Sequence, residues 1–260
     1  MSTEKIYRGV LESLKRQPIR RGIDYLDIGA GSGELIGRIR NQFDIQECRA
    51  CDYTDTLMKM PGQKVDVVNL NRAPLPYREA SFDLVTATEV IEHMENPRCF
   101  LREISRVLKP GGLCVLSTPN VLNLNSRLRY LWFGFPDLFG PLSLGNRVLE
   151  SCAGHISPQS YFYLRHALHE ADFVEVSLKV DRFQRSGLAK LIFLAAPLKF
   201  FSFFIRRREI RKYSTVDETN CVIVGQMNSF KMLLGRTLIL TAIKSDRRVE
   251  AGGQCPCLPQ

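Results

Sequence analysis

The sequence predicts an α/β fold, in which helices cover both faces of a doubly wound, mostly parallel sheet. Short apolar strands alternate with helical segments between residues 23 and 120, which is the order of βαβ units. The strand expected over 82–87 is almost wholly apolar beyond Asp83, as a strand covered on both faces should be. A glycine-rich turn follows the first strand, at the edge where such sheets bind ligands.

The elements follow from hydrophobic periodicity and from the residues that end each segment. One helix, for example, begins at Pro97 in its first turn and is stopped by Pro110, Gly111 and Gly112. Strands are expected over 23–28, 48–51, 65–68, 82–87, 113–117, 173–180 and 237–243. Helices are expected over 4–16, from the glycine turn to about 42, over 97–108 and over 158–171.

The length of 260 residues accommodates one α/β domain with insertions. After Asn120 the regular alternation of strand and helix patterns ends, which divides the chain into a core and less regular segments. The expected divisions are 1–22, an N-terminal helix; 23–120, the cofactor-binding core; 121–157, a substrate lid; 158–181, a core helix and strand; 182–235, an apolar and basic insert; 236–245, a closing strand; and 246–260, a disordered tail.

Charge and cysteine usage bear on the surroundings of the protein. The net charge of +9 suggests nucleic acid, anionic lipid or an acidic small substrate as a partner. The eight scattered cysteines favour free thiols in a reducing compartment over a disulfide framework. Cys255 and Cys257 lack the partners that a zinc site needs. The first twenty residues contain no signal-peptide-like apolar run, so a cytoplasmic location is expected.

The turn Gly29-Ala30-Gly31-Ser32-Gly33 lets the backbone bend tightly and lets a ligand approach without meeting a Cβ atom. A dinucleotide fingerprint would need a third glycine at position 34, where Glu34 stands. Asp27 can accept hydrogen bonds from a cationic amino group such as the one S-adenosylmethionine (SAM) carries. Asp52, at the end of the second strand, can hold both ribose hydroxyls. A structural turn and a helix-capping Asp52 are the alternatives.

The run of motifs over residues 23–120 resembles the class I SAM-dependent methyltransferases. It is most similar to ubiquinone-biosynthesis O-methyltransferases and to methyltransferases of bacterial glycolipid or polysaccharide clusters. The resemblance implies a Rossmann-like, seven-stranded sheet with an antiparallel last strand and a helical cap or insert. The matching stretches are LDIGAGSGE at 26–34, Asp52, LPY at 75–77 leading to SFDLV at 81–85, EVIEH at 89–93, RVLKPGG at 106–112 and STPN at 117–120.

Carried over to this sequence, the resemblance assigns roles around the cofactor. Gly29, Ala30, Gly31 and Gly33 would line the methionine end, and Asp52 would hold the ribose with Tyr53 beside the adenine. Asn69 stands where the family has an acidic or amide residue near the adenine amino group, and Leu70 follows it. Thr88 and Glu89 would border the sulfonium.

Two histidines are candidate catalytic residues. His93 follows the fourth strand, at the ligand-binding edge of the sheet, and His155 lies just before the helix expected from 158. Either could act as a general base toward a hydroxyl acceptor. In the alternative interpretation, His93 packs structurally on its helix and His155 belongs to a turn. No metal is expected.

The acceptor and the partners are less determined. Thr88-Glu89-Val90-Ile91 differs from the Pro-Pro-aromatic motif of base-modifying amino-methyltransferases, so nucleic acid is not expected. Residues 187–205 are apolar but interrupted by Lys190, Pro197 and Lys199, and basic residues follow through Lys212. This pattern favours an in-plane helix at 187–212 on an anionic membrane. Alternatively, residues 187–205 and the apolar residues of 128–139 form a cap over an apolar pocket.

The sequence therefore predicts a SAM-dependent methyltransferase that acts on a small or lipid-linked acceptor, at oxygen. The protein would be cytoplasmic, or peripheral on the inner membrane face. The alternatives are a soluble small-molecule methyltransferase with an apolar lid, a catalytically silent SAM-binding subunit or scaffold, and, as the most distant, a nicotinamide-dependent oxidoreductase.

Overall fold

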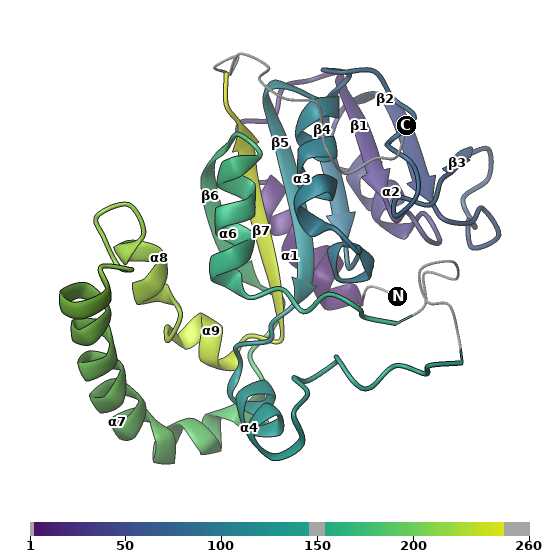
Figure 1. The fold of residues 1–260 in the computed structure, drawn as a ribbon. Helices are drawn as coiled ribbons and strands as arrows, with labels where there is room; N and C mark the ends of the chain where they lie inside the picture. The colour runs from purple at the N-terminus through teal and green to yellow at the C-terminus, as the bar shows by residue number, and fades with distance from the viewer. Residues whose placement is uncertain (1–2, 146–153, 247–260) are drawn as a thin grey trace.

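A computed structural model describes residues 3–145 and 154–246 and contains one seven-stranded sheet (Figure 1). The strand order is β3-β2-β1-β4-β5-β7-β6, and β7 runs antiparallel to both of its neighbours. The sheet confirms the predicted doubly wound fold and its antiparallel closing strand. The strands are β1 (Ile23–Ile28), β2 (Ile45–Asp52), β3 (Val65–Val67), β4 (Phe82–Thr88), β5 (Leu108–Pro119), β6 (Phe173–Val180) and β7 (Thr237–Lys244).

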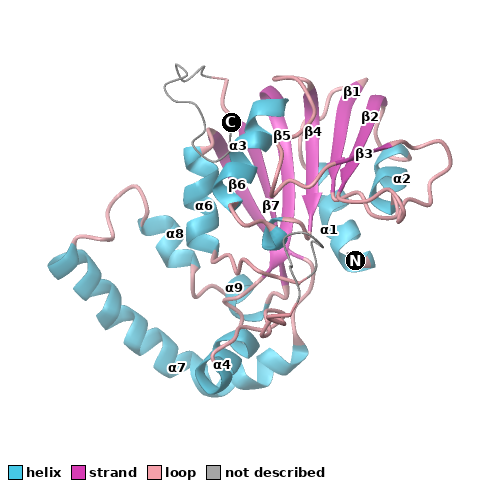
Figure 2. Ribbon diagram, turned by 45° about the vertical axis from the view of Figure 1, so that its right-hand side comes forward, coloured by secondary structure: helices cyan, strands magenta, loops and turns pink. Residues whose placement is uncertain are grey.

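Helices cover both faces of the sheet (Figures 1 and 2). On one face α1 (Glu4–Leu14) and α2 (Glu34–Arg40) pack Ile6, Val10 and Leu35 into a buried cluster with Tyr25 and Val115. On the other face, α3 (Pro97–Val107) and α6 (Tyr161–Glu170) bury a second cluster around Phe100, Ile104 and Leu164. This two-sided burial explains why the central strands are apolar on both faces.

The predicted boundaries agree with the structure where capping or helix-breaking residues mark the ends of an element. Strands β1 and β6 match their predicted ranges, and α3 begins at Pro97 behind Asn96, whose side chain accepts a hydrogen bond from the Cys99 backbone N–H. The strand predicted over 113–117 is longer: β5 starts at Leu108 and includes the glycine pair. Gly111 has φ +72° there, and pairing with β4 shifts register between Phe82 and Leu84. The glycines thus bend a strand and do not only end a helix.

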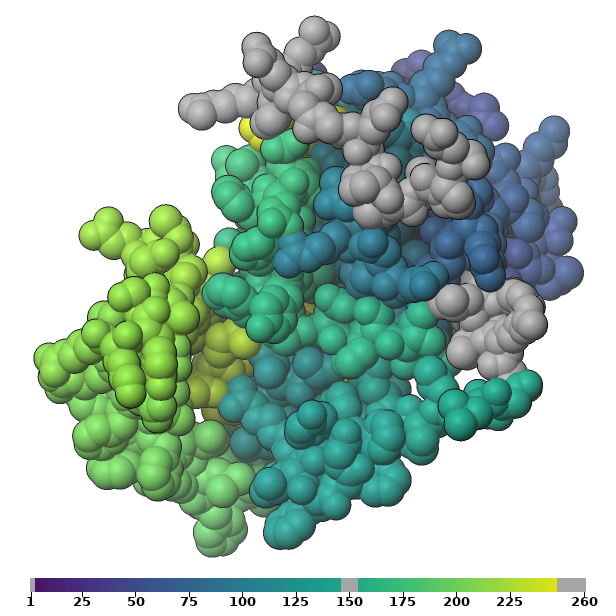
Figure 3. Space-filling view, viewed as in Figure 1, coloured from purple at the N-terminus to yellow at the C-terminus, as the bar shows by residue number. Residues whose placement is uncertain are grey.

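The second half of the chain adds helices beside the sheet. The 3-10 helix η1 (Ile91–His93) follows β4, and α4 (Leu124–Phe133) follows β5. After β6 the long helix α7 (Arg185–Arg208) continues into a π-helical turn, η2 (Glu209–Tyr213). Two short helices, α8 (Cys221–Gln226) and α9 (Phe230–Leu234), lead to β7. Figure 3 shows α7 and α8 in a lobe beside α6, away from the blue half of the sheet.

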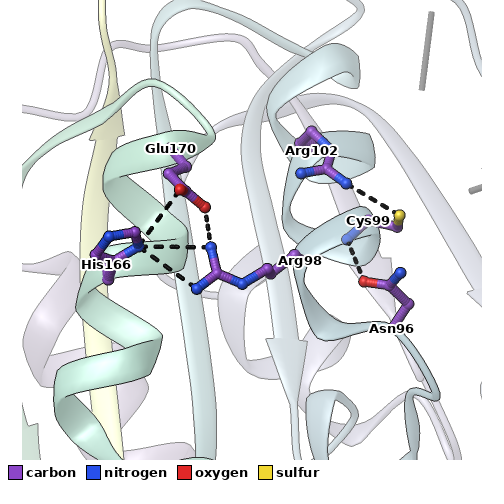
Figure 4. A network of polar contacts seen from close by, with 6 residues as sticks. All are labelled: Asn96, Arg98, Cys99, Arg102, His166 and Glu170. Carbon is purple, nitrogen blue, oxygen red and sulfur yellow. Dashed lines mark hydrogen bonds and ion pairs between the residues drawn. The ribbon is translucent and has the colours of Figure 1, made fainter. Parts of the chain in front are cut away.

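Polar side chains join α3 to α6 across the surface (Figure 4). Arg98 forms an ion pair with Glu170, and His166 lies within 3.6 Å of the same carboxylate. Arg102 donates to Cys99 Sγ over 3.1 Å. Cys99 is disulfide-bonded, so the expectation of free thiols is wrong at this position, whereas Cys48, Cys51, Cys114 and Cys221 are free. Cys152, the Cys255–Cys257 pair and the tail from 247 lie outside the described residues.

Candidate functional site

A cavity of about 410 Å³ opens where β1, β2 and β4 end. This volume is typical of a small-molecule site, and its position at the carboxyl edge is where ligands bind in such sheets. The cavity brings together ten of the thirteen predicted site residues: Asp27, Gly29, Ala30, Gly31, Asp52, Tyr53, Leu70, Thr88, Glu89 and His93.

The conformation of the glycine turn requires glycine at position 29. Gly29 has φ +71°, and a Cβ atom there would lie 2.4 Å from the Val90 side chain. The N–H groups of Gly29 and Ala30 donate to the Cys51 carbonyl over 2.8 and 3.3 Å. These two N–H groups therefore fix the turn against β2. The absence of a Cβ atom at Gly29 leaves space for the Val90 side chain, which lines the cavity.

Asp52 stands at the end of β2 with its carboxylate held by two backbone groups. Gly31 donates to Oδ2 over 2.8 Å, and Tyr53 donates to Oδ1 over 2.7 Å. Each carboxylate oxygen accepts more than one hydrogen bond. Asp52 therefore keeps acceptor capacity toward the cavity while its position is fixed by the glycine turn.

Asp27 is the buried acid of the site, at 1% exposure. Its Oδ1 accepts a hydrogen bond from Thr86 over 2.6 Å, and the Thr86 hydroxyl lies 2.7 Å from the Tyr25 hydroxyl. Burial raises the pKa of Asp27 to about 7, and the nearby Asp52 adds to the rise, while the hydrogen bonds from Thr86 and Tyr25 oppose it. A cationic ligand beside Asp27 would stabilise its ionised form.

Glu89 occupies a strained position directly after β4. Its φ of +56° is uncommon for a residue other than glycine. Ser117 of β5 holds it: the Glu89 backbone N–H donates to the Ser117 carbonyl and hydroxyl oxygens, each over 3.1 Å, and the hydroxyl lies 3.1 Å from Glu89 Oε1. Burial raises the pKa of Glu89 to about 7, against the lowering effect of the Ser117 hydrogen bond.

The two candidate histidines lie together at the edge of the cavity. Their ring centroids are 5.0 Å apart in an edge-to-face arrangement, and His93 Nδ1 lies 2.8 Å from the Gly154 carbonyl. Burial lowers the pKa of both His93 and His155. Of the two, His93 lines the cavity, as does Gly154. The neutral form of both rings is thus favoured near pH 7.

Three predicted residues do not line the cavity. Gly33 begins α2 and packs against Met58, while His155 lies behind His93. Asn69 uses its Oδ1 to accept the Asn71 N–H over 3.0 Å, so this oxygen shapes its own turn. Sequence reasoning missed other lining residues. Ile28, Ser32 and Val90 lie within the matched motifs but were given no role, and the others lie outside the motifs: Tyr7, Leu35, Cys51, Leu57, Val68, Met94 and Gly154.

Glu34, which replaces the third glycine of a dinucleotide fingerprint, points to the surface. It forms an ion pair with Arg38 at 2.6 Å, and Arg38 also binds Glu4 of α1. This arrangement places an acid at the start of α2, where a dinucleotide fold would approach a pyrophosphate. The start of α2 therefore lacks the third glycine of a dinucleotide fingerprint.

The fold and this site are those of a Rossmann-like methyltransferase. A family model described as a methyltransferase domain matches residues 3–178, so the chain belongs to the methyltransferase domain family. Over 103 residues the chain is 37% identical to a Mycobacterium tuberculosis protein described as a probable S-adenosylmethionine-dependent methyltransferase, covering 37% of this chain and 36% of that protein.

Two further similarities concern the sequence and the fold. The ubiquinone/menaquinone biosynthesis C-methyltransferase UbiE of Cronobacter sakazakii is 28% identical over 151 residues, which are 54% of this chain and 53% of that protein. The structure of the methyltransferase in complex with the Haloferax volcanii Trm112 activator superposes with a TM-score of 0.57 at 16% identity, covering 94% and 92% of the two chains. The matches with these curated relatives thus span about a third to a half of their lengths, whereas the fold is shared almost throughout.

Proposed function

We propose that this protein transfers a methyl group from SAM to an oxygen of a small or lipid-linked acceptor, while it rests on an anionic membrane surface. The observation that carries the methyl transfer is the single cavity shared by Asp27, Asp52 and Glu89 beside an unobstructed glycine turn. SAM supplies a methyl group that its sulfonium already activates, so the protein must mainly bind, align and exclude water.

The residues of the cavity suit the parts of SAM in order. Asp52 keeps acceptor capacity for two ribose hydroxyls, and Tyr53 lies next to it at the cavity wall. Asp27 is the counter-charge for the ammonium group of the methionine end. This pairing also explains a buried acid that has only hydroxyl partners, since a bound cation offsets its desolvation.

The two histidines support oxygen as the methylated atom. A hydroxyl acceptor must lose a proton, and a neutral imidazole has a lone pair that acts on such a hydroxyl. His93 reaches the cavity with its ring held by the Gly154 carbonyl. Carbon is the second candidate, because one relative is named a C-methyltransferase. Mass spectrometry of the methylated product separates the two, since an O-methyl ether and a C-methyl group fragment differently.

Binding of SAM is tested by the change in melting temperature. SAM or its demethylated product should raise the melting temperature of the protein by several degrees at saturation, and NAD should not. Asp52→Ala should weaken SAM binding by about 100-fold, since it removes charge-assisted hydrogen bonds worth roughly 1.5–3 kcal/mol each. Calorimetric titration with SAM measures this loss.

The matched control is Asp44→Ala, which removes an exposed acid from the residue just before β2. Asp52→Asn keeps one acceptor oxygen, so its affinity for SAM should lie between those of Asp52→Ala and Asp44→Ala. Unchanged SAM affinity in Asp52→Ala would contradict the assignment of the ribose. A silent SAM-binding subunit would bind SAM but transfer no labelled methyl group to any compound of a lipid or aqueous cell extract.

Helix α7 supports the membrane part of the proposal. One face packs Leu191, Leu194 and Leu198 against α4 and α9. The rest of the helix exposes large apolar side chains, which a surface helix in water normally lacks. Those exposed by more than half are Ile192, Phe193, Phe200, Phe201, Phe203, Phe204 and Ile205. On α4, the exposed Leu131 and Trp132 continue the same kind of surface.

Charge favours an anionic bilayer as the occupant of this surface. The apolar face of α7 ends at Arg206, Arg207 and Arg208, and Arg211 and Lys212 follow. Among the described residues, Arg185–Tyr213 is the helical stretch long and apolar enough to cross a membrane, and no part of its apolar window is buried. No residue of α7 lines the cofactor cavity, so the alternative cap over the pocket has no support there. Lys199 and Pro197 in mid-helix favour an in-plane position.

Vesicle flotation tests the membrane proposal. The protein should float with vesicles that contain phosphatidylserine and much less with pure phosphatidylcholine. Replacing Arg206, Arg207 and Arg208 by Gln should lower the affinity for anionic vesicles roughly 100-fold, at about 1 kcal/mol per charge. Deleting residues 187–212 should abolish flotation.

The control removes the same number of charges elsewhere, by replacing the exposed Lys15, Arg16 and Arg20 with Gln. These residues lie between α1 and β1, at the amino edge of the sheet. Equal loss of flotation in both triple variants would contradict a role specific to α7. Protein that resists extraction with alkaline carbonate would indicate a spanning helix and overturn the in-plane position.

A further inference from the structure

A second polar cluster lies at the edge of the cofactor cavity. Glu92 and His93 come from η1, and His155 comes from the segment that returns to the sheet before α6. Each of the three residues offers one nitrogen or oxygen atom, and these atoms all lie within 4.8 Å of one another. Two ligands on opposite sides of a metal ion are at most about 4.2 Å apart, at roughly 2.1 Å from the ion each. Small side-chain rotations would therefore suffice to bind one.

Glu92 lacks a partner for its charge. The residue is 0% exposed, and its carboxylate has no ion-pair partner within residues 3–145 and 154–246; the neutral Thr118 hydroxyl lies beside it but makes no well-formed hydrogen bond. Burying an ionised carboxylate in this state costs several kcal/mol. Its backbone is, by contrast, well held: the Glu92 carbonyl accepts the N–H groups of Ile156 and Ser157 over 2.9 and 3.0 Å. These bonds keep the His155 segment against η1.

The two imidazoles are oriented in the same manner. The Gly154 carbonyl can only accept, so His93 donates its Nδ1–H to it over 2.8 Å and keeps a lone pair on Nε2. His155 donates to the Leu138 carbonyl, while its Nδ1 is buried and has no partner in the described part of the chain. Metal-binding histidines are characteristically held through one N–H by a backbone carbonyl, with the other nitrogen turned to the ion.

From this juxtaposition we infer that Glu92, His93 and His155 bind one divalent transition-metal ion. One carboxylate and two imidazoles form a donor set for Zn²⁺, Mn²⁺, Fe²⁺ or Co²⁺, whereas Mg²⁺ and Ca²⁺ prefer oxygen ligands. The ion supplies the positive counter-charge that the Glu92 carboxylate lacks. This site replaces the sequence-based expectation that the protein binds no metal.

The position of the site deepens the proposed function, on which this step rests. Three protein ligands leave at least one coordination position open. His93 and Gly154 line the cofactor cavity, so an ion held by His93 would lie within reach of a molecule bound in that cavity. A hydroxyl oxygen of the acceptor bound there would lose its proton more readily, because a divalent ion lowers the pKa of a bound hydroxyl group. With the ion bound, both histidines serve as its ligands in place of the general base, and the hydroxyl proton passes to a water molecule. The acceptor is then a molecule with an oxygen that binds metal.

Manganese binding tests the site. The protein is treated with a chelator, dialysed and titrated with Mn²⁺, whose free-ion electron paramagnetic resonance signal falls as it binds. We expect one strongly bound Mn²⁺ per chain, which Zn²⁺ displaces. Glu92→Gln and His155→Gln should each weaken Mn²⁺ binding more than tenfold. His169→Gln, which removes an exposed histidine of α6, should leave the affinity unchanged.

Absence of a strong Mn²⁺ or Zn²⁺ site in the full chain would overturn the inference. Equal affinity in Glu92→Gln, His155→Gln and His169→Gln would do the same. Each variant is also melted with and without SAM, which shows that it is folded. Should Glu92→Gln not fold, His155→Gln decides, because His155 is only half-buried. Metal binding without a SAM-induced rise in melting temperature would reject the methyltransferase and keep the metal site. A SAM-induced rise without metal binding would keep the methyltransferase and reject the metal site.

Discussion

At the scale of single residues, the site depends on acids whose burial differs. Asp52 is held by two backbone N–H groups, whereas Asp27 is held by the hydroxyls of Thr86 and Tyr25 and lies almost fully buried. The sequence indicates both acids from their spacing around the glycine turn. Their different environments come from tertiary packing, because Thr86 belongs to β4, far along the chain from Asp27.

Asp27 should make the stability of the SAM-free protein depend on pH. Its pKa is about 7 in the folded protein, compared with 3.8 for an aspartate carboxyl exposed to water in the unfolded chain. Between these values the folded state binds more protons than the unfolded state, so stability falls as pH rises from about 4 to 7. The loss is complete above the folded pKa. At about 1.36 kcal/mol per pKa unit, it is on the order of 4 kcal/mol.

Asp27→Asn removes the titration of Asp27. Comparison with the original protein therefore separates the effect of Asp27 on stability from that of Glu89, whose pKa is also about 7. Urea unfolding should give similar free energies of unfolding for the two proteins at pH 4 and a more stable variant at pH 8. The same variant should bind SAM more weakly, because it lacks the counter-charge for the ammonium group. Parallel stability curves for the two proteins across this pH range would refute the buried, titrating Asp27.

At the scale of elements, Asn120 fixes how the second half of the chain joins the sheet. The residue follows β5 and is 1% exposed. Its Nδ2 donates to the carbonyls of Met232 and Gly235, each over 2.8 Å, and its Oδ1 accepts the Leu122 N–H over 3.0 Å. One side chain thus connects the end of β5, the approach to α4 and the end of α9.

Asn120→Ala should lower the free energy of unfolding by about 3 kcal/mol. The variant leaves one buried N–H and two buried carbonyls without this partner, at roughly 1 kcal/mol or more each. Chemical denaturation measures the change. Asn41→Ala, at the exposed end of α2, is the control and should change the free energy by less than about 0.5 kcal/mol. A loss as small as that of the control would show that the junction does not depend on Asn120.

Helix α7 shows a limit of prediction at the same scale. Its composition indicates an apolar helix followed by basic residues, but a buried cap and a membrane-facing helix share this composition. The contacts of Leu191 and Leu194 with the α4–α9 cluster, and the exposure of Phe193 and Phe201, are properties of the assembled fold. They could not be deduced from periodicity along the chain.

At the scale of the whole molecule, the net charge of +9 supplies a long-range attraction to anionic surfaces. Figures 1 and 2 place α4 and α7 beyond the carboxyl ends of the parallel strands, toward which the cofactor cavity also opens. A membrane contacted by these helices would therefore lie near the edge of the sheet from which an acceptor enters. This geometry suits a lipid-linked acceptor.

Flotation with anionic vesicles should decrease as salt rises, but it should not disappear. The Debye length shortens from about 10 Å at 0.1 M to about 3 Å at 1 M ionic strength, which screens the arginines after α7. Burial of the exposed phenylalanines is not screened. Repeating the assay at both salt concentrations measures the two contributions. Complete release at 1 M salt would show that the apolar face of α7 does not enter the bilayer.

Much of the core of the fold and most of the residues that line the candidate site could be predicted from the sequence. The glycine turn, Asp52 and Glu89 each follow a strand, and parallel strands bring their carboxyl ends to one edge, so local order along the chain becomes proximity in space. Tyr7, from α1, could not be predicted in the cavity, because no motif marks it and its position depends on how α1 packs. Asn69 was assigned from resemblance, yet its oxygen caps a local turn.

The sequence by itself determined the doubly wound fold, the class of methyltransferase and the acids that line the candidate site, because strand–turn–helix order and residue chemistry act locally. Only the tertiary structure decided that His155 meets Glu92 and His93, that Glu92 is buried without an ion-pair partner among the described residues, and that α7 lies apart from the cavity. Those features depend on contacts between residues distant in the chain. Such contacts are selected by the packing of the whole molecule, which no local pattern records.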